Sequence, residues 1–473
     1  QMEALELYKK LLGKEHSLVA TSLSNVGLTL GELGKYEEAL KYEIEALKIW
    51  KKNLGEEHPL VTIGLNNVGM MLGELGKDNE ALKYQMEALE LSKKLLGVEH
   101  PDVAIGLNNV GLTLGKLGKY EEALKYQIEA LELKKQLLGQ KHPSVATSLN
   151  NVGLMLGELG KHEEALKYQM EALDLKKQLL GEEHPSVATS LNHVGFTLGE
   201  LGKYEEALKY QLEALELRKK LLGKEHPDVA SSLNNVGLTF GDLGKQEEAL
   251  KYQMEALELR KKLLGEEHPD VASSLNNVGL TLGELGKHEE ALKYQMEALE
   301  LRKQLLGEEH PDVVSSLDNV VAILGKLGKY EEALKYQIEV LELRKKVFNW
   351  DHPLVAISFN DLALVLFRLN KHKDALKSSK KGLEIFERLK YDLNHPMVIT
   401  LQSNLEAQKK EAFSKVVEFV SKAQQLDKQE ALNLYQEAFS ILLEIYDEAL
   451  PTLSASFIAL EIVQKIPVEA WVG

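Results

Sequence analysis

The sequence predicts an all-α fold, a right-handed α-solenoid followed by a small C-terminal helical bundle. The first observation is a 42-residue unit that recurs along the chain, and a histidine opens every copy. These histidines are His16, His58, His100, His142, His184, His226, His268, His310 and His352. The second observation is that each unit holds two helical patterns and no strand pattern. A fixed period of about 20–50 residues is typical of repeat architectures, and two helices per unit favour the solenoid.

Each unit begins with a helix that we call helix A. In the unit from 226 to 267 we expect helix A to run from about Pro227 to Leu243. Proline suits a first helical position because its missing N–H would be unpaired there anyway. Apolar residues then recur at steps of three and four, which indicates a helix with one buried side. The dipeptide Gly244-Lys245 should end it.

The second helix, helix B, is expected to begin near Gln246 and to end before Gly265, where a left-handed cap residue is typical. Its apolar positions form a wide face. Small side chains at Gly237, Ala249 and Ala256 should let helices A and B approach closely.

Helix B carries the letters GK-x-EEALKY and EALEL, which resemble the second half of a tetratricopeptide (TPR) repeat, whose usual period is about 34 residues. The longer period, with LNNVG in helix A and LGEEHPDV between units, is similar to the TPR domain of kinesin light chains. The resemblance covers about residues 1–394. It implies stacked helix pairs, a concave face lined by helix A, and a role in protein interaction.

The array divides into a half repeat at 1–13, eight 42-residue repeats at 16–351 and a degenerate repeat at 352–394. The chain opens inside a helix B (Gln1 to Leu12), so we expect it to be a fragment. In the eighth repeat the small positions become Val321 and Val340, and Asn349 replaces the capping glycine. Larger residues at a close crossing predict a change of superhelical curvature near residues 320–345, with simple terminal capping as the alternative.

Residues 395–473 lose the period and predict a C-terminal helical cap. Met397 to Gln425 indicates one long helix or two, residues 427–430 suggest a capping box for a helix to about Glu448, and a third apolar stretch follows Pro451. The segment from 421 to 445 is similar to microtubule-interacting-and-trafficking (MIT) domains, which are three-helix bundles. A decayed TPR pair that only caps the array explains the same letters.

Composition limits the classes of function. The 473 residues carry a net charge of −16, which disfavours nucleic acid and anionic membrane surfaces and favours basic or amphipathic peptides. The chain contains no cysteine, so disulfides and thiol chemistry are excluded. We find no signal peptide and no apolar run long enough to span a membrane, and we expect a cytoplasmic protein.

Catalytic and metal-binding patterns are not evident. The repeated histidines lie next to carboxylates, but equivalent positions of stacked helices are about 8–10 Å apart, whereas zinc ligands lie about 2 Å from one ion. We therefore interpret these histidines as helix caps. The sequence has no P-loop and no GxSxG motif, and its glycines follow the repeat. We expect neither an enzyme nor a cofactor.

Helix A carries three rows of side chains opposite its buried stripe, with one position per repeat. The apolar row comprises Leu28, Met70, Leu112, Leu154, Phe196, Leu238, Leu280 and Ala322. The asparagine row comprises Asn66, Asn108, Asn150, Asn192, Asn234 and Asn276. The acidic row comprises Glu32, Glu74, Glu158, Glu200, Asp242 and Glu284, and Lys116 and Lys326 interrupt it.

These rows predict one continuous groove for a peptide. Each asparagine can offer a donor and an acceptor to a peptide backbone, the apolar row supplies contact area, and the acidic row favours Lys or Arg in the ligand. The resemblance to kinesin light chains implies the same role for the first asparagine of each LNN pair. A structural alternative is that the leucines are buried between adjacent A helices and the asparagines bridge neighbouring backbones.

The function we predict is a non-catalytic scaffold that binds a peptide segment with apolar and basic residues. The first alternative is a structural spacer or a rod that self-associates through its repeat ends. The second is the regulatory or sensor arm of a larger protein.

Overall fold

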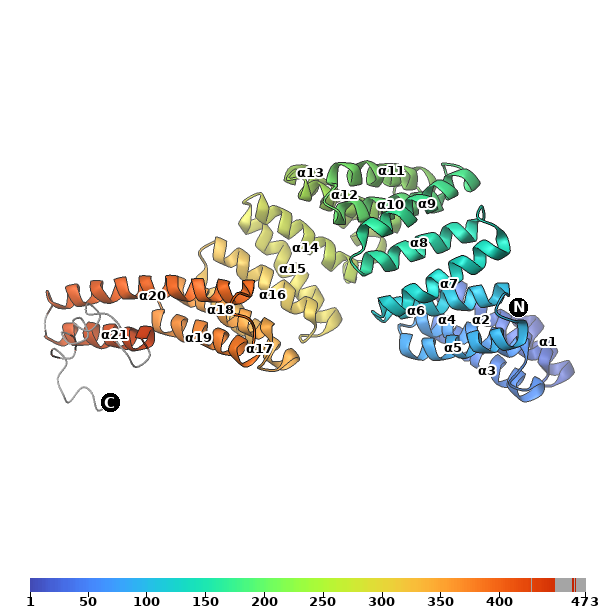
Figure 1. Ribbon diagram of the computed structural model, residues 1–473, viewed down its shortest axis with the longest axis horizontal. Coiled ribbons are helices and arrows are strands. Elements are labelled where there is room, and N and C mark those ends of the chain that lie inside the picture. The colour runs from blue at the N-terminus through green and yellow to red at the C-terminus, as the bar shows by residue number, and fades with distance from the viewer. Residues whose placement is uncertain (427, 447–461, 463, 465–473) are drawn as a thin grey trace. The chain divides into compact units, whose positions relative to one another are not determined.

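The computed structural model describes residues 1–426, 428–446, 462 and 464, and all regular elements among them are helices. The prediction of an all-α repeat architecture is confirmed. The chain divides into two compact units, Gln1–Lys245 and Gln246–Gly473, which we describe separately (Figure 1). This division falls inside the array, and the predicted boundary at 394 stays a prediction.

Unit 1 alternates helices of type A and type B. Its A helices are α2 (Ser17–Glu32), α4 (Pro59–Glu74), α6 (Pro101–Lys116), α8 (Pro143–Glu158), α10 (Pro185–Glu200) and α12 (Pro227–Asp242). Its B helices are α1 (Met2–Leu12), α3 (Tyr36–Leu54), α5 (Asp78–Leu96), α7 (Tyr120–Leu138), α9 (His162–Leu180) and α11 (Tyr204–Leu222).

Unit 2 continues the same pattern and then departs from it. Its A helices are α14 (Pro269–Glu284), α16 (Pro311–Lys326) and α18 (Pro353–Arg368). Its B helices are α13 (Gln246–Leu264), α15 (His288–Leu306), α17 (Tyr330–Phe348) and α19 (His372–Arg388). The longer α20 (Pro396–Ala423) follows, and then α21 (Lys428–Tyr446).

Each A helix begins at a histidine cap, as the sequence predicted. His184 Nδ1 accepts a hydrogen bond from the Ser186 backbone N–H at 3.1 Å, and the other repeat histidines make the same bond two residues ahead. The proline that usually follows occupies the first helical position. The bond satisfies one of the N–H groups that a helix start leaves without a partner.

Removing one such cap should destabilise its helix by a modest, measurable amount. We expect His184→Ala to lower the free energy of unfolding by about 1 kcal/mol, because no side-chain acceptor remains for the Ser186 N–H. His184→Asn, which keeps an acceptor at the same distance along the chain, should retain most of the stability. Denaturant unfolding followed by circular dichroism measures both, and equal losses in the two variants would contradict the capping role.

The ends of the B helices require left-handed backbone. Gly139, which follows α7, has φ 79°, a region that side chains with a Cβ avoid. After α17 the corresponding residue is Asn349, with φ 64°. Asparagine tolerates this conformation better than other non-glycine residues. The prediction that Asn349 replaces the capping glycine after helix B is therefore confirmed.

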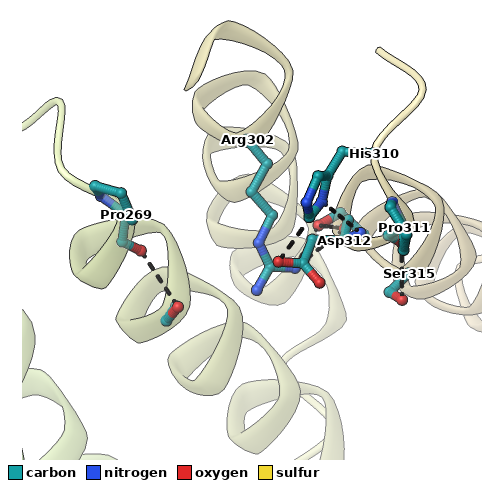
Figure 2. A network of polar contacts seen from close by, with 8 residues as sticks. Pro269, Arg302, His310, Pro311, Asp312 and Ser315 are labelled. Carbon is teal, nitrogen blue, oxygen red and sulfur yellow. Dashed lines mark hydrogen bonds and ion pairs between the residues drawn. The ribbon is translucent and has the colours of Figure 1, made fainter. Parts of the chain in front are cut away.

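A basic side chain of each later B helix ties its repeat to the next. Arg302 Nη1 on α15 donates to Ser316 Oγ on α16 at 2.7 Å. It also donates to the Asp312 backbone oxygen at 3.3 Å, and Figure 2 shows Arg302 beside Asp312. The same bond to serine is made by Lys134, Lys176, Arg218, Arg260 and Arg344. Because these cations lie between helices, desolvation lowers the pKa of Lys134 and Lys176.

The start of α20 still follows the repeat. His395 Nδ1 accepts from the Met397 N–H at 3.3 Å, and Asn404 Nδ2 donates to Asn360 Oδ1 on α18 at 3.0 Å. Helix α20 is a single helix, the first of the two possibilities left open for this stretch. Most of the predicted third helix, and Asp427 of the predicted capping box, lie outside the described residues, and an MIT-like bundle stays a prediction.

Helices long and apolar enough to cross a membrane do not occur in the described part of the chain.

Candidate functional site

The A helices lie on the inner side of unit 1. Neighbouring A helices contact one another at α2 and α4, α6 and α8, α8 and α10, and α10 and α12, whereas consecutive B helices do not come equally close. A stack in which one helix type is spaced more tightly curves toward that type. We therefore expect the three rows predicted from the sequence on this inner face, opposite the contact with helix B.

The apolar row is largely exposed, which argues against its burial between adjacent A helices. In unit 1 the exposed fractions are 38% for Leu112, 57% for Phe196 and 42% for Leu238. In unit 2 Leu280 is 42% exposed, and Leu154 is half-buried. An apolar side chain exposed at the same place in successive repeats forms a strip rather than scattered single residues, and such strips mark interaction surfaces.

The asparagine row forms a ladder of side-chain hydrogen bonds. Asn109 Nδ2 donates to Asn66 Oδ1 at 3.0 Å, so the second asparagine of one repeat bonds the first asparagine of the repeat before it. The same bond joins Asn151 to Asn108, Asn235 to Asn192 and, in unit 2, Asn319 to Asn276. The asparagines thus bridge neighbouring side chains, and not neighbouring backbones as the structural alternative held.

The ladder changes what the asparagines can offer to a ligand. Their Oδ1 atoms already accept one hydrogen bond, which leaves a second oxygen lone pair and the Nδ2 amino group for a ligand, and the peptide contact stays a prediction. At Asn108, Asn192 and Asn276 this amino group makes no hydrogen bond within the described structure. Asn150 and Asn234 are buried, with 7% and 9% exposure, whereas Asn192 between them is half-buried, so the row is not uniformly accessible.

His193 takes the place of the second asparagine in its repeat. Its Nδ1 lies 2.7 Å from Asn150 Oδ1. Burial, with the charges of Lys176 and Arg218 as smaller causes, lowers the pKa of His193 to about 4. The ring is therefore neutral at physiological pH and donates its Nδ1 proton to the asparagine oxygen, which keeps the ladder intact. The sequence analysis did not predict a role for the second residue of each LNN pair, although asparagine recurs there in most repeats.

The apolar and acidic rows meet in a hollow between α10, α11 and α12. The hollow has a volume of about 320 Å³, and its lining includes Phe196, Leu238, Glu200 and Asp242. Desolvation and, secondly, the negative charge of Glu200 raise the pKa of Asp242. Neither Asn192 nor Asn234 lines it, so the structure brings two of the three predicted rows together here. The hollow can accept an apolar group beside a cation.

The corresponding face of unit 2 differs in charge. Asp318 takes the place of the row asparagine and pairs with Arg344 Nη2 at 2.5 Å. Burial raises the pKa of Asp318 to about 6, although the Arg344 charge opposes this shift. A hollow of about 580 Å³ includes this pair together with Lys326 and Arg368. The face around α16 and α18 therefore carries basic side chains that the hollow at Phe196 and Leu238 lacks.

Metal-ligating residues do not gather in groups of three or more anywhere in the described residues.

Comparison with known families gives one match that covers most of the chain. The model described as "Tetratricopeptide repeat" matches residues 60–136, 102–178, 144–207, 186–262, 242–304, 270–321 and 312–388, and a second model with the same description matches residues 19–60. None of the curated proteins compared with the chain matches it.

Solved structures similar to this chain share its fold at low sequence identity. A STAND signal-transduction ATPase with a tetratricopeptide repeat sensor, from Pyrococcus horikoshii, aligns with a TM-score of 0.57 and 16% identity over 84% of this chain and 55% of its own. The apo quorum sensor NprR from B. thuringiensis aligns with a TM-score of 0.50 and 18% identity over 76% and 98% of the two chains. A putative kinesin light chain from Podosopora anserina, with nearly identical TPR-like repeats, has a TM-score of 0.40 and 21% identity over 44% and 98%.

Proposed function

This chain belongs to the tetratricopeptide repeat family, and from that premise we propose that it is a non-catalytic scaffold whose unit 1 binds a peptide segment of a partner protein along the inner face of its A helices. The observation that carries the proposal is the hollow at Phe196 and Leu238, where exposed apolar side chains stand beside Glu200 and Asp242. A surface strip of this kind gains free energy when an apolar side chain covers it.

The chemistry of the face defines the ligand. An apolar anchor fits between Phe196 and Leu238, and a Lys or Arg close to it in the peptide sequence meets the two carboxylates. The Nδ2 groups of Asn108 and Asn192 can each donate to a peptide carbonyl, since in the ladder bonds these two residues use only their Oδ1 atoms. The ligand is therefore an extended or helical segment with apolar and basic residues.

A peptide array tests the proposal directly. Peptides selected on the purified chain should be enriched in an apolar residue near a Lys or Arg. The double variant Phe196→Ser, Leu238→Ser should bind them at least tenfold more weakly, because it removes the apolar contact on both sides of the hollow. Glu200→Gln with Asp242→Asn should weaken binding less and flatten its salt dependence, since it removes only the charge.

The matched control is Ile128→Ser. Ile128 is 40% exposed, close to the 42% of Leu238, but it belongs to the B helix α7. Its replacement should leave peptide affinity unchanged. If no peptide is selected, or if Ile128→Ser weakens binding as much as the double variant does, the inner face is not the binding surface and a spacer role becomes the better explanation.

A further inference from the structure

A separate apolar cavity lies between α4, α5 and α6. Its volume is about 240 Å³, and its walls include Ile63 on α4, Leu95 and Leu96 on α5, and Ile105 and Gly106 on α6. Ile63 and Ile105 are 48% and 51% exposed and form its rim. The cavity exists because two facing positions, Ser92 on α5 and Gly106 on α6, both carry small side chains.

The equivalent space is filled at other junctions of the array. In the preceding junction the indole ring of Trp50 occupies this space and packs against Gly64. Trp50 is only 2% exposed. From Lys134 to Arg344 a Lys or Arg reaches across to a serine, as at Arg302. In the last repeat the ring of Phe386 takes the position and is 1% exposed. Among the described junctions from α3 to α19, the junction between α5 and α6 lacks a large side chain to fill the space.

Trp50 shows which shape suits such a space. It packs in one core cluster with Ala46 and Leu54. The residues one repeat later are Ala88 and Leu96, and both line the cavity. Two of the residues on the α5 side are therefore the same in the two junctions, whereas Leu95 stands in place of Asn53 and the ring of Trp50 is missing from the second. A planar aromatic group of indole size matches them.

The cavity also carries one polar group that lacks a partner. Thr62 lines it, and its Oγ1 is buried without a hydrogen bond within the described structure. The preceding and following repeats have Ala20 and Ala104 at this position. A buried hydroxyl without a partner is destabilising unless a ligand supplies one. The N–H of an indole in the cavity could donate to it once the Thr62 side chain rotates, because in this conformation the oxygen is closed off from the cavity.

We propose that this cavity is a binding site for one indole-sized aromatic group with a hydrogen-bond donor, held between α4, α5 and α6 and contacted by Thr62. The aromatic group can come from a free small molecule or from a tryptophan side chain of a peptide. The site is distinct from the hollow at α10 and α12 and does not depend on peptide binding there.

Calorimetric titration of the purified chain with indole and with N-acetyl-tryptophanamide distinguishes the two sources. Saturable binding of indole at one site per chain supports the proposal. Binding of both probes assigns the site to a side chain as well as to a free ligand, and binding of indole alone assigns it to a small molecule. If neither probe binds saturably, the proposal is wrong.

Three variants place the bound probe in this cavity. Ser92→Trp supplies the ring that Trp50 supplies one repeat earlier, and it should weaken indole binding at least tenfold while raising the unfolding temperature. Ser92→Lys with Gly106→Ser copies the pair at Lys134 and Ser148 and should also abolish binding. Thr62→Val should remove the preference for indole over benzothiophene, which has the same shape and no N–H.

Leu238→Ser is the control for location. It alters the hollow between α10, α11 and α12 and should leave indole affinity within twofold of that of the unchanged chain. Circular dichroism verifies that each variant is folded, and Thr62→Val tests the site even if a bulkier variant fails to fold. Unchanged indole affinity in both Ser92 variants would place the probe elsewhere and overturn the assignment.

Discussion

Replacing Glu43 by glutamine is expected to stabilise the first repeat by about 3 kcal/mol above pH 7 and by much less near pH 4. Glu43 on α3 is fully buried. Desolvation raises its pKa to about 7, although hydrogen bonds from Ser24 and Asn67 oppose the shift. Helix B of the next seven repeats has glutamine at this position, beginning with Gln85, so the neutral side chain fits the same surroundings.

The pH dependence follows from the direction of the shift. The folded chain holds the Glu43 proton to higher pH than the unfolded chain, whose carboxyl has a pKa near 4.5. Between pH 4.5 and about 7 the folded state binds more protons, so stability falls as pH rises and the loss is complete above pH 7. Glutamine does not titrate, so the advantage of Glu43→Gln should grow across this window and then stay constant.

Hydrogen exchange of α2 and α3 at several pH values measures this difference locally, which suits an array whose repeats contribute separately to stability. The reciprocal control is Gln127→Glu. Gln127 is fully buried and its Nε2 donates to the Asn108 backbone oxygen at 2.9 Å, so a carboxylate there should introduce the same loss at high pH. A stability difference for Glu43→Gln that does not change between pH 4 and pH 8 would show that Glu43 titrates normally.

The periodic features of the fold could be predicted from the sequence because they depend on local chemistry. The position of proline predicted the start of α12 at Pro227, and the position of glycine predicted the end of α13 at Leu264. Both predictions agree with the structure within one residue. The histidine caps act over two residues and could be recognised in the same way. The three rows on helix A followed from helix geometry alone.

The contacts between repeats could not be predicted, because they depend on where side chains point in three dimensions. The ladder joins Asn109 to Asn66, and the sequence shows both amides without showing that one satisfies the other. The sequence shows Ser92 as a departure from the repeat and Gly106 as a glycine shared only with Gly64. That they face one another across two helices, with nothing between them, required the structure.

The close contact between helix A and helix B leads to the second large effect. Gly153 on α8 lies against α9, and a Cβ at this position would be 2.7 Å from Gln169 Cγ and 3.1 Å from the Ala165 backbone oxygen. The glutamine can move, but the backbone oxygen cannot move without shifting the helix. We expect Gly153→Ala to destabilise the array by about 2 kcal/mol, in the range typical of overpacked cores.

Gly157 provides a control in the same helix. It lies one turn further along α8, and a Cβ there would meet nothing within 4 Å. Gly157→Ala should therefore stabilise the chain by up to about 1 kcal/mol, because alanine favours the helix more than glycine does. Denaturant unfolding of the two single variants should give changes of opposite sign. Equal changes would mean that helix propensity, and not the crossing of α8 and α9, decides the effect of a glycine in this repeat.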